Sequence, residues 1–105
     1  MRRRDMLLAG LGAACARPAR AAEAEVVIDN FVFTPPALTV AAGTRVTWRN
    51  RDDIPHSVVS AATPPLFKSM ALDTDESFSR VFDTPGSYPY FCGLHPHMTG
   101  KVTVT

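Results

Sequence analysis

Short segments in which apolar and polar residues alternate follow one another through most of the chain. The first covers residues 26–33, and the segment 45–50 places Val46 and Trp48 on one apolar face. Alternation with a period of two is typical of a half-buried β-strand. Nine prolines are spread over 105 residues, and they separate many of these segments. The pattern therefore predicts several short strands and no long helix.

Further strands are expected where the alternation returns, at residues 38–40, 58–59, 77–82, 88–92 and 100–104. About seven short strands with regular turn signals predict an all-β protein, a Greek-key antiparallel β-sandwich with a single domain. Arg80 shares the alternating face of its strand with two phenylalanines, which indicates an edge strand or a bulge. Residues 60–72 are interpreted as irregular, because Pro64 and Pro65 exclude a helix start there.

The turn at Pro85 and Gly86 is followed closely by a tyrosine. Tyr88 follows the turn glycine by two residues, as the tyrosine corner of a Greek-key sandwich would. An ordinary half-exposed strand aromatic is the alternative interpretation.

The N-terminal segment has the pattern of an export signal. Three arginines at positions 2–4 precede an apolar run, and Ala19 and Ala21 flank a small-x-small cleavage pattern. Residues 1–21 are therefore predicted to be a signal peptide, and residues 22–105 the folded domain. The paired arginines followed by Asp5 resemble a twin-arginine signal. The apolar run is too short to span a bilayer, so we expect no membrane anchor. A lipoprotein linked through Cys15 is an alternative, although Gly12 stands where such signals usually carry Leu.

Removal of residues 1–21 changes the net charge from +1 to about −3. A mildly acidic domain without a basic patch is not expected to bind nucleic acid, since Arg45, Arg49 and Arg51 are spread along a strand and a turn. Cys92 would then be the one remaining thiol. An exported domain with a single thiol cannot form an internal disulfide, so the thiol is a candidate metal ligand.

Four potential metal ligands of three chemical types lie near strand ends. Cys92, His95 and Met98 fall in one short run, and His56 lies upstream in a Pro-His-Ser-Val segment. Two imidazoles, a thiolate and a weak axial thioether are the ligand set of blue copper sites. The sequence therefore predicts one copper ion that alternates between Cu(I) and Cu(II), which is suited to one-electron transfer.

Several other functions use the same residues. A cysteine nucleophile paired with a histidine is the enzymatic alternative, but it leaves Met98 and one histidine without a role. A copper storage or delivery module and a structural sandwich that takes up zinc are two further alternatives. Strong visible absorption and fast reversible reduction would separate the electron carrier from both.

The chain resembles the cupredoxins, and within them the amicyanin and plastocyanin branch. The resemblance rests on three motifs, in chain order: Gly43-Thr44-x-Val46-Thr47-Trp48-x-Asn50, Pro55-His56-Ser57-Val58, and the run from Thr84-Pro85-Gly86-Ser87-Tyr88 to Cys92-x-x-His95-Pro96-x-Met98-x-Gly100. It implies a periplasmic carrier of single electrons between larger redox proteins. An amicyanin would have a dehydrogenase as donor and a c-type cytochrome as acceptor. We expect a monomer.

The resemblance also implies a site through which electrons reach the copper, and it shows where this chain differs from the family pattern. His95 is the expected electron port, inside an apolar collar of Pro55, Leu94 and Pro96, joined by Leu66 or Phe67. Ser57 and Gly93 replace the residues that commonly link the two ligand segments, so we expect a weaker link. The backbone N–H near Ser57 is expected to donate to the Cys92 sulfur. His97 is either a solvent-exposed loop residue or a group that modulates docking or binds a second metal.

Overall fold

A computed structural model describes residues 22–105 of the chain. The predicted signal peptide, residues 1–21, lies outside the described residues, and so does Cys15. The described part of the chain has eight strands: β2 (Glu23–Asp29), β3 (Val32–Thr34), β4 (Ala37–Val40), β5 (Thr44–Asn50), β6 (Val59–Ser60), β7 (Ser77–Phe82), β8 (Gly86–Phe91) and β9 (Thr99–Val104). Residues 22–105 contain no helix that is long and apolar enough to cross a membrane.

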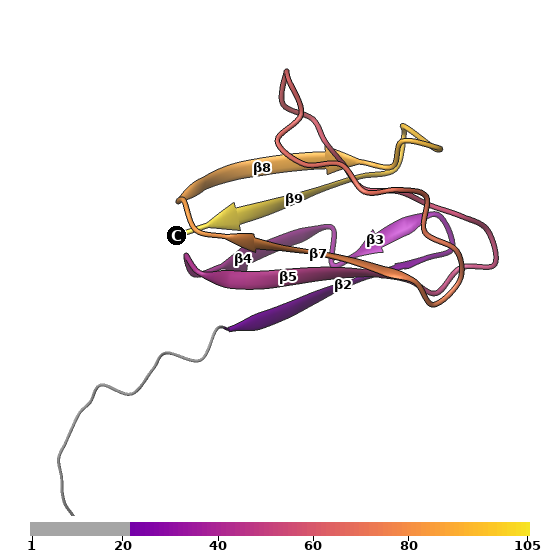
Figure 1. Cartoon of the computed structure of the whole chain (residues 1–105), viewed down its shortest axis with the longest axis horizontal. Coiled ribbons are helices and arrows are strands. Elements are labelled where there is room, and N and C mark those ends of the chain that lie inside the picture. Colours follow the sequence, from indigo (N-terminus) through magenta and orange to yellow (C-terminus); the bar gives the residue numbers. More distant parts are fainter. Residues whose placement is uncertain (1–21) are drawn as a thin grey trace, which may run out of the picture.

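The strands form two sheets of four strands each. One sheet has the order β3-β2-β5-β7 and the other β4-β9-β8-β6. In Figure 1, β8 and β9 lie as one layer over β5 and β7, and β8 runs toward the end of the molecule opposite the C-terminus. The predicted all-β, single-domain sandwich is confirmed.

The sheets are mixed rather than wholly antiparallel. β2 pairs with β5 in parallel, and β4 pairs with β9 in parallel, whereas the remaining pairs are antiparallel. The alternation of a strand shows which of its faces is buried, but it does not identify the strand beside it. The parallel pairs join segments that are distant in sequence, so the local pattern did not predict them.

The core lies between the two sheets and is built around Trp48. This side chain is fully buried on β5, and its ring stands edge-on to Tyr90 of the opposite sheet at a centroid distance of 5.3 Å. Gly100 makes this arrangement possible, because a Cβ at that position would overlap the Tyr90 ring. Aromatic pairs across two sheets bury large apolar areas and prefer such edge-to-face geometry. The core therefore fixes the relation of β5 to β8, the strands that precede the two predicted ligand segments.

Three predictions about local features are confirmed. β7 is an edge strand, as Arg80 indicated, and the Arg80 guanidinium lies 5.1 Å from the ring centroid of Phe67. The segment between β6 and β7 contains no helix, and it folds over the sandwich by burying Phe67 and Leu72. Tyr88 forms a tyrosine corner, since its hydroxyl donates to the carbonyl oxygen of Thr84.

Candidate metal centre

A buried amide organises the turn that delivers His56. Asn50, the last residue of β5, is fully buried, and its Nδ2 donates to the carbonyl oxygens of Ile54 (2.9 Å) and Leu72 (2.8 Å). Its Oδ1 accepts the Asp52 N–H at 2.9 Å. These bonds satisfy both amide donors and wrap the polar turn around the side chain. The turn after β5 is therefore fixed by side-chain bonds to its own backbone.

His56 is held on its backbone and on its ring. Its N–H and C=O pair with Leu72 at 3.1 and 2.7 Å, and its side chain is fully buried. The ring Nε2 lies 2.9 Å from Oδ2 of Asp52. An ionised carboxylate only accepts hydrogen bonds, so Nε2 carries the proton and Nδ1 is left as a ligand atom. This hydrogen bond from His56 is also the main reason why the pKa of Asp52 is lowered.

The second ligand segment is a tight loop between β8 and β9. The Cys92 N–H donates to the carbonyl oxygen of Met98 at 3.0 Å, and the His95 N–H to that of Cys92 at 3.2 Å. The Met98 N–H donates to the carbonyl oxygen of His95 at 2.9 Å, which closes the loop on itself. Cys92 and Met98 are buried, whereas His95 is half-buried and His97 is exposed.

The fold brings the three strong candidate ligands together. Sγ of Cys92 lies 3.6 Å from Nδ1 of His56 and 3.7 Å from Nδ1 of His95, and the three atoms all lie within 4.8 Å of one another. Nitrogen and sulfur atoms bound about 2.0 and 2.3 Å from one metal ion are about 3.5–3.7 Å apart in tetrahedral to trigonal geometry. The donor set and its spacing therefore fit one copper ion. Met98 is 3% exposed and lies at the end of the same loop.

The two ligand segments are linked through Ser57 and Gly93. The expected bond from the Ser57 N–H to the Cys92 Sγ is present at 3.3 Å. The Gly93 N–H donates to Oγ of Ser57 at 2.9 Å. The link that we expected to be weaker is therefore made, through a serine hydroxyl and a backbone donor. Glycine at position 93 leaves room for this hydrogen bond, because a Cβ there would lie 2.8 Å from the Ser57 Oγ.

Phe31 is a neighbour of the site that the sequence did not predict. Its ring is edge-on to His56 and to His95, with centroid distances of 5.6 and 5.1 Å and interplanar angles of 87° and 86°. The sequence pattern placed Phe31 in one continuous first strand. The structure instead ends β2 at Asp29 and turns through Asn30 and Phe31, whose φ angles are 52° and 62°. Asp52 was also missed, although its position four residues before His56 was a usable signal.

The residues expected to form an apolar collar around His95 differ in their burial. Leu94 is half exposed, and Pro55 and Pro96 are exposed. Phe67 is not part of a collar, because it packs against Trp48 in the core. Phe31, 44% exposed, takes a place beside His95 that we had assigned to the segment after β6.

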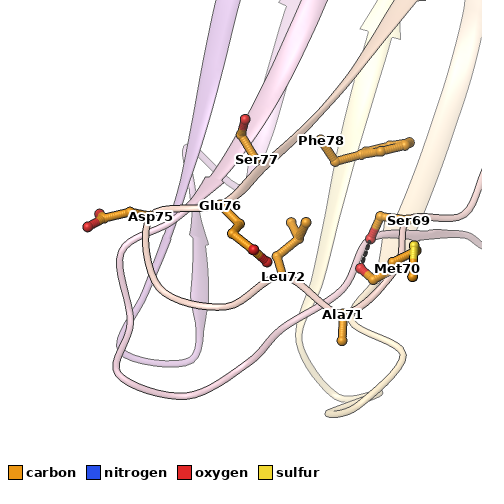
Figure 2. Close-up of a pocket in the computed structure, with 8 residues that line it drawn as sticks. All are labelled: Ser69, Met70, Ala71, Leu72, Asp75, Glu76, Ser77 and Phe78. Carbon is orange, nitrogen blue, oxygen red and sulfur yellow. Dashed lines mark hydrogen bonds between the residues drawn. The ribbon is translucent and has the colours of Figure 1, made fainter.

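Neither His97 nor the pocket beside residues 69–78 adds a ligand to the metal centre. His97 lines a shallow hollow with Phe31 and Met98, but among residues 22–105 the cluster of metal-binding side chains is His56, Cys92 and His95 alone. Figure 2 shows a separate pocket between residues 69–72 and 75–78, where the Ser69 hydroxyl donates to the carbonyl oxygen of Met70. Both acidic groups of this pocket are already bound, Asp75 to Arg51 and Glu76 to the Asp73 N–H.

Comparisons with known proteins agree with the geometry. The family of the cupredoxin-like domain matches residues 6–104. Amicyanin-alpha from Methylorubrum extorquens is 37% identical over 82% of this chain and 75% of its own length. Chloroplastic plastocyanin from Tetradesmus obliquus is 38% identical over 89% of this chain and 73% of its own length. The solved structure of a purple cupredoxin from Nitrosopumilus maritimus superposes with a TM-score of 0.74 at 35% identity, covering 78% of this chain and 99% of its own.

A family match over nearly the whole chain and relatives above 30% identity identify the family without relying on the fold alone. The clustered His-Cys-His site adds the chemistry that the family requires. The chain therefore belongs to the cupredoxin family and is a blue copper electron carrier rather than an enzyme.

Proposed function

We propose that His56, Cys92 and His95 are the strong ligands of one copper ion and that Met98 is its weak axial ligand. The observation that carries this assignment is the triangle of Nδ1, Sγ and Nδ1 atoms, all within 4.8 Å of one another. When bound in such a site, copper supplies a Cu(I)/Cu(II) couple that changes its geometry little between the two states. Met98 is supported by its burial and by its place at the end of the ligand loop.

The protein's contribution is to hold the ligand atoms in place before and after electron transfer. Asp52 fixes the tautomer and the orientation of the His56 ring. The Ser57 N–H donates to the Cys92 sulfur, which withdraws electron density from the thiolate. Because both segments are bonded to the sandwich and to each other, the site needs little rearrangement when its charge changes.

His95 is the proposed electron port. It is the half-buried ligand. The exposed Phe31 ring contacts the His95 ring, and the exposed Leu94 is its neighbour in the same loop. A small apolar surface suits brief, weak docking of redox partners. By similarity to amicyanin, the partners are a dehydrogenase as donor and a c-type cytochrome as acceptor.

We further propose that the protein works in the periplasm after removal of residues 1–21. The support is the basic, apolar and small-residue order of that segment. The twin-arginine route is the proposed path. N-terminal sequencing of the protein purified from the periplasm of a host should begin at Ala22, whereas a lipid-modified N-terminal Cys15 would show the lipoprotein alternative instead.

The function is tested by loading purified protein with Cu(II) and recording its visible spectrum. A thiolate-to-copper charge-transfer band should appear at one equivalent and vanish reversibly on reduction. Cys92→Ser should remove the band, while the exposed control Thr39→Ser should keep it. A colourless complex, or a bound copper that cannot be reduced and reoxidised quickly, would instead favour storage or delivery.

A further inference from the structure

We propose that Phe31 is a positioning residue that fixes the angle between the two ligand imidazoles. This inference rests on the proposed ligand roles of His56 and His95. Phe31 is not a ligand, and it lies in the turn between β2 and β3, two strands that contribute no ligand. Its position is defined by three separate features of the structure: its backbone conformation, its anchor and its ring contacts.

The backbone at Phe31 is unusual for its residue type. Asn30 and Phe31 both have positive φ angles, 52° and 62°. Asparagine tolerates this left-handed region, but for a bulky residue it is a rare and strained conformation. Strain of this kind persists where the surrounding structure holds it, and it gathers at functional sites. Packing in the core does not account for it here, because Phe31 is 44% exposed.

Asp52 provides the anchor that holds this conformation. Its Oδ2 accepts the Phe31 N–H at 3.2 Å and is also the atom 2.9 Å from Nε2 of His56. One carboxylate oxygen therefore ties the turn between β2 and β3 to a ligand ring. A rotation of the His56 ring would therefore displace the Phe31 backbone, and a displacement of the Phe31 backbone would rotate the His56 ring.

The ring contacts complete the arrangement. The Phe31 ring stands almost perpendicular to both imidazoles, and the two imidazoles lie 5.0 Å apart with an interplanar angle of 54°. Edge-to-face contacts have a preferred geometry, so a ring that makes two of them resists rotation of either partner. The backbone hydrogen bonds of His95 come from its own loop, whereas Phe31 contacts the His95 ring from the turn that joins β2 to β3 of the other sheet. Phe31 thus connects the more exposed ligand to the buried one.

The test compares four variants of the full chain. Phe31→Ala removes the ring, Phe31→Leu keeps apolar volume without an aromatic edge, and Phe31→Tyr keeps the ring. Val32→Ala is the matched control, because Val32 is the next residue and is 53% exposed. The first readout is the rate at which Cu(II) passes to an excess of chelator. Loss of two edge-to-face contacts should raise this rate about tenfold in Phe31→Ala.

The second readout reports orientation rather than stability. Cross-relaxation between the ring protons of His56 and His95 is measured by NMR in the apo protein and in the Cu(I) form. Phe31→Ala and Phe31→Leu should change these cross-relaxation rates, whereas Phe31→Tyr and Val32→Ala should match the wild type. The proposal is overturned if Phe31→Ala keeps the wild-type release rate and cross-relaxation rates, or if Val32→Ala has equal effects. Failure of the proposed function would be distinguishable, since the wild type itself would then lack the charge-transfer band.

Discussion

The turn that carries His56 and the loop that carries His95 hold the same kind of ligand in opposite ways. The turn after β5 is built around the buried side chains of Asn50 and His56, and a carboxylate fixes the ligand ring. The loop after β8 is held by three backbone bonds within residues 92–98, and it leaves His95 half-buried. One ligand is thus fixed from inside the protein, and the other faces the surface.

This difference separates two requirements of an electron carrier. The buried turn keeps water away from the ligand and sets the ring orientation, which favours low reorganisation. The half-buried ring gives a short path to a docked partner, which a fully buried site lacks. The Ser57–Gly93 bond and Phe31 join the two regions. Substitutions within each region should therefore affect different measurements.

The largest effect is expected from Asn50→Ala in the buried turn. It leaves the Ile54 and Leu72 carbonyl oxygens and the Asp52 N–H without their side-chain partner. Three lost bonds should lower the free energy of unfolding of the apo protein by about 3 kcal/mol. Urea denaturation measures this directly. A loss below about 1 kcal/mol would mean that the turn is not organised by this amide.

A Cβ at position 93 tests the bond between the two regions. Gly93→Ala places an atom 2.8 Å from the Ser57 Oγ and 3.2 Å from Cγ2 of Val59, so the apo protein should lose about 2 kcal/mol of stability. Ser57→Ala should cost about 1 kcal/mol by removing one hydrogen bond. In the double variant the methyl group gains space, so the combined loss should be smaller than the sum. Strictly additive losses would show that the two residues are not matched in size.

Asp52→Asn tests whether the carboxylate orients the buried ligand. The amide keeps the shape but removes the charge that holds the Nε2 proton of His56. Substitutions of such supporting groups commonly weaken metal binding at least about tenfold. Competition with a copper chelator measures the change. Asp53→Asn, in the same turn but exposed, is the control and should bind as the wild type does.

The sequence predicted the local features of both regions better than the contacts between them. Strand alternation around Trp48 and the spacing of Cys92 and His95 depend on near neighbours, and the structure has the strand and brings these two side chains together. Phe31 and Asp52 meet across 21 positions, and no periodic pattern encodes that contact. The parallel pairing of β2 with β5 was missed for the same reason. Gly93 was identified as a departure from the family pattern, but the effect of this glycine depends on Ser57, which lies 36 positions away.

The most direct test of the division between the two regions is the electron self-exchange rate of Leu94→Glu, measured by NMR in mixtures of oxidised and reduced protein. Leu94 is half exposed in the His95 loop and can be changed without altering the core. A charge there repels an identical molecule and disrupts apolar docking. The self-exchange rate should fall at least about tenfold while the charge-transfer band stays unchanged. A rate equal to that of the wild type would contradict electron transfer through this surface, and a changed band would contradict the separation of the two regions.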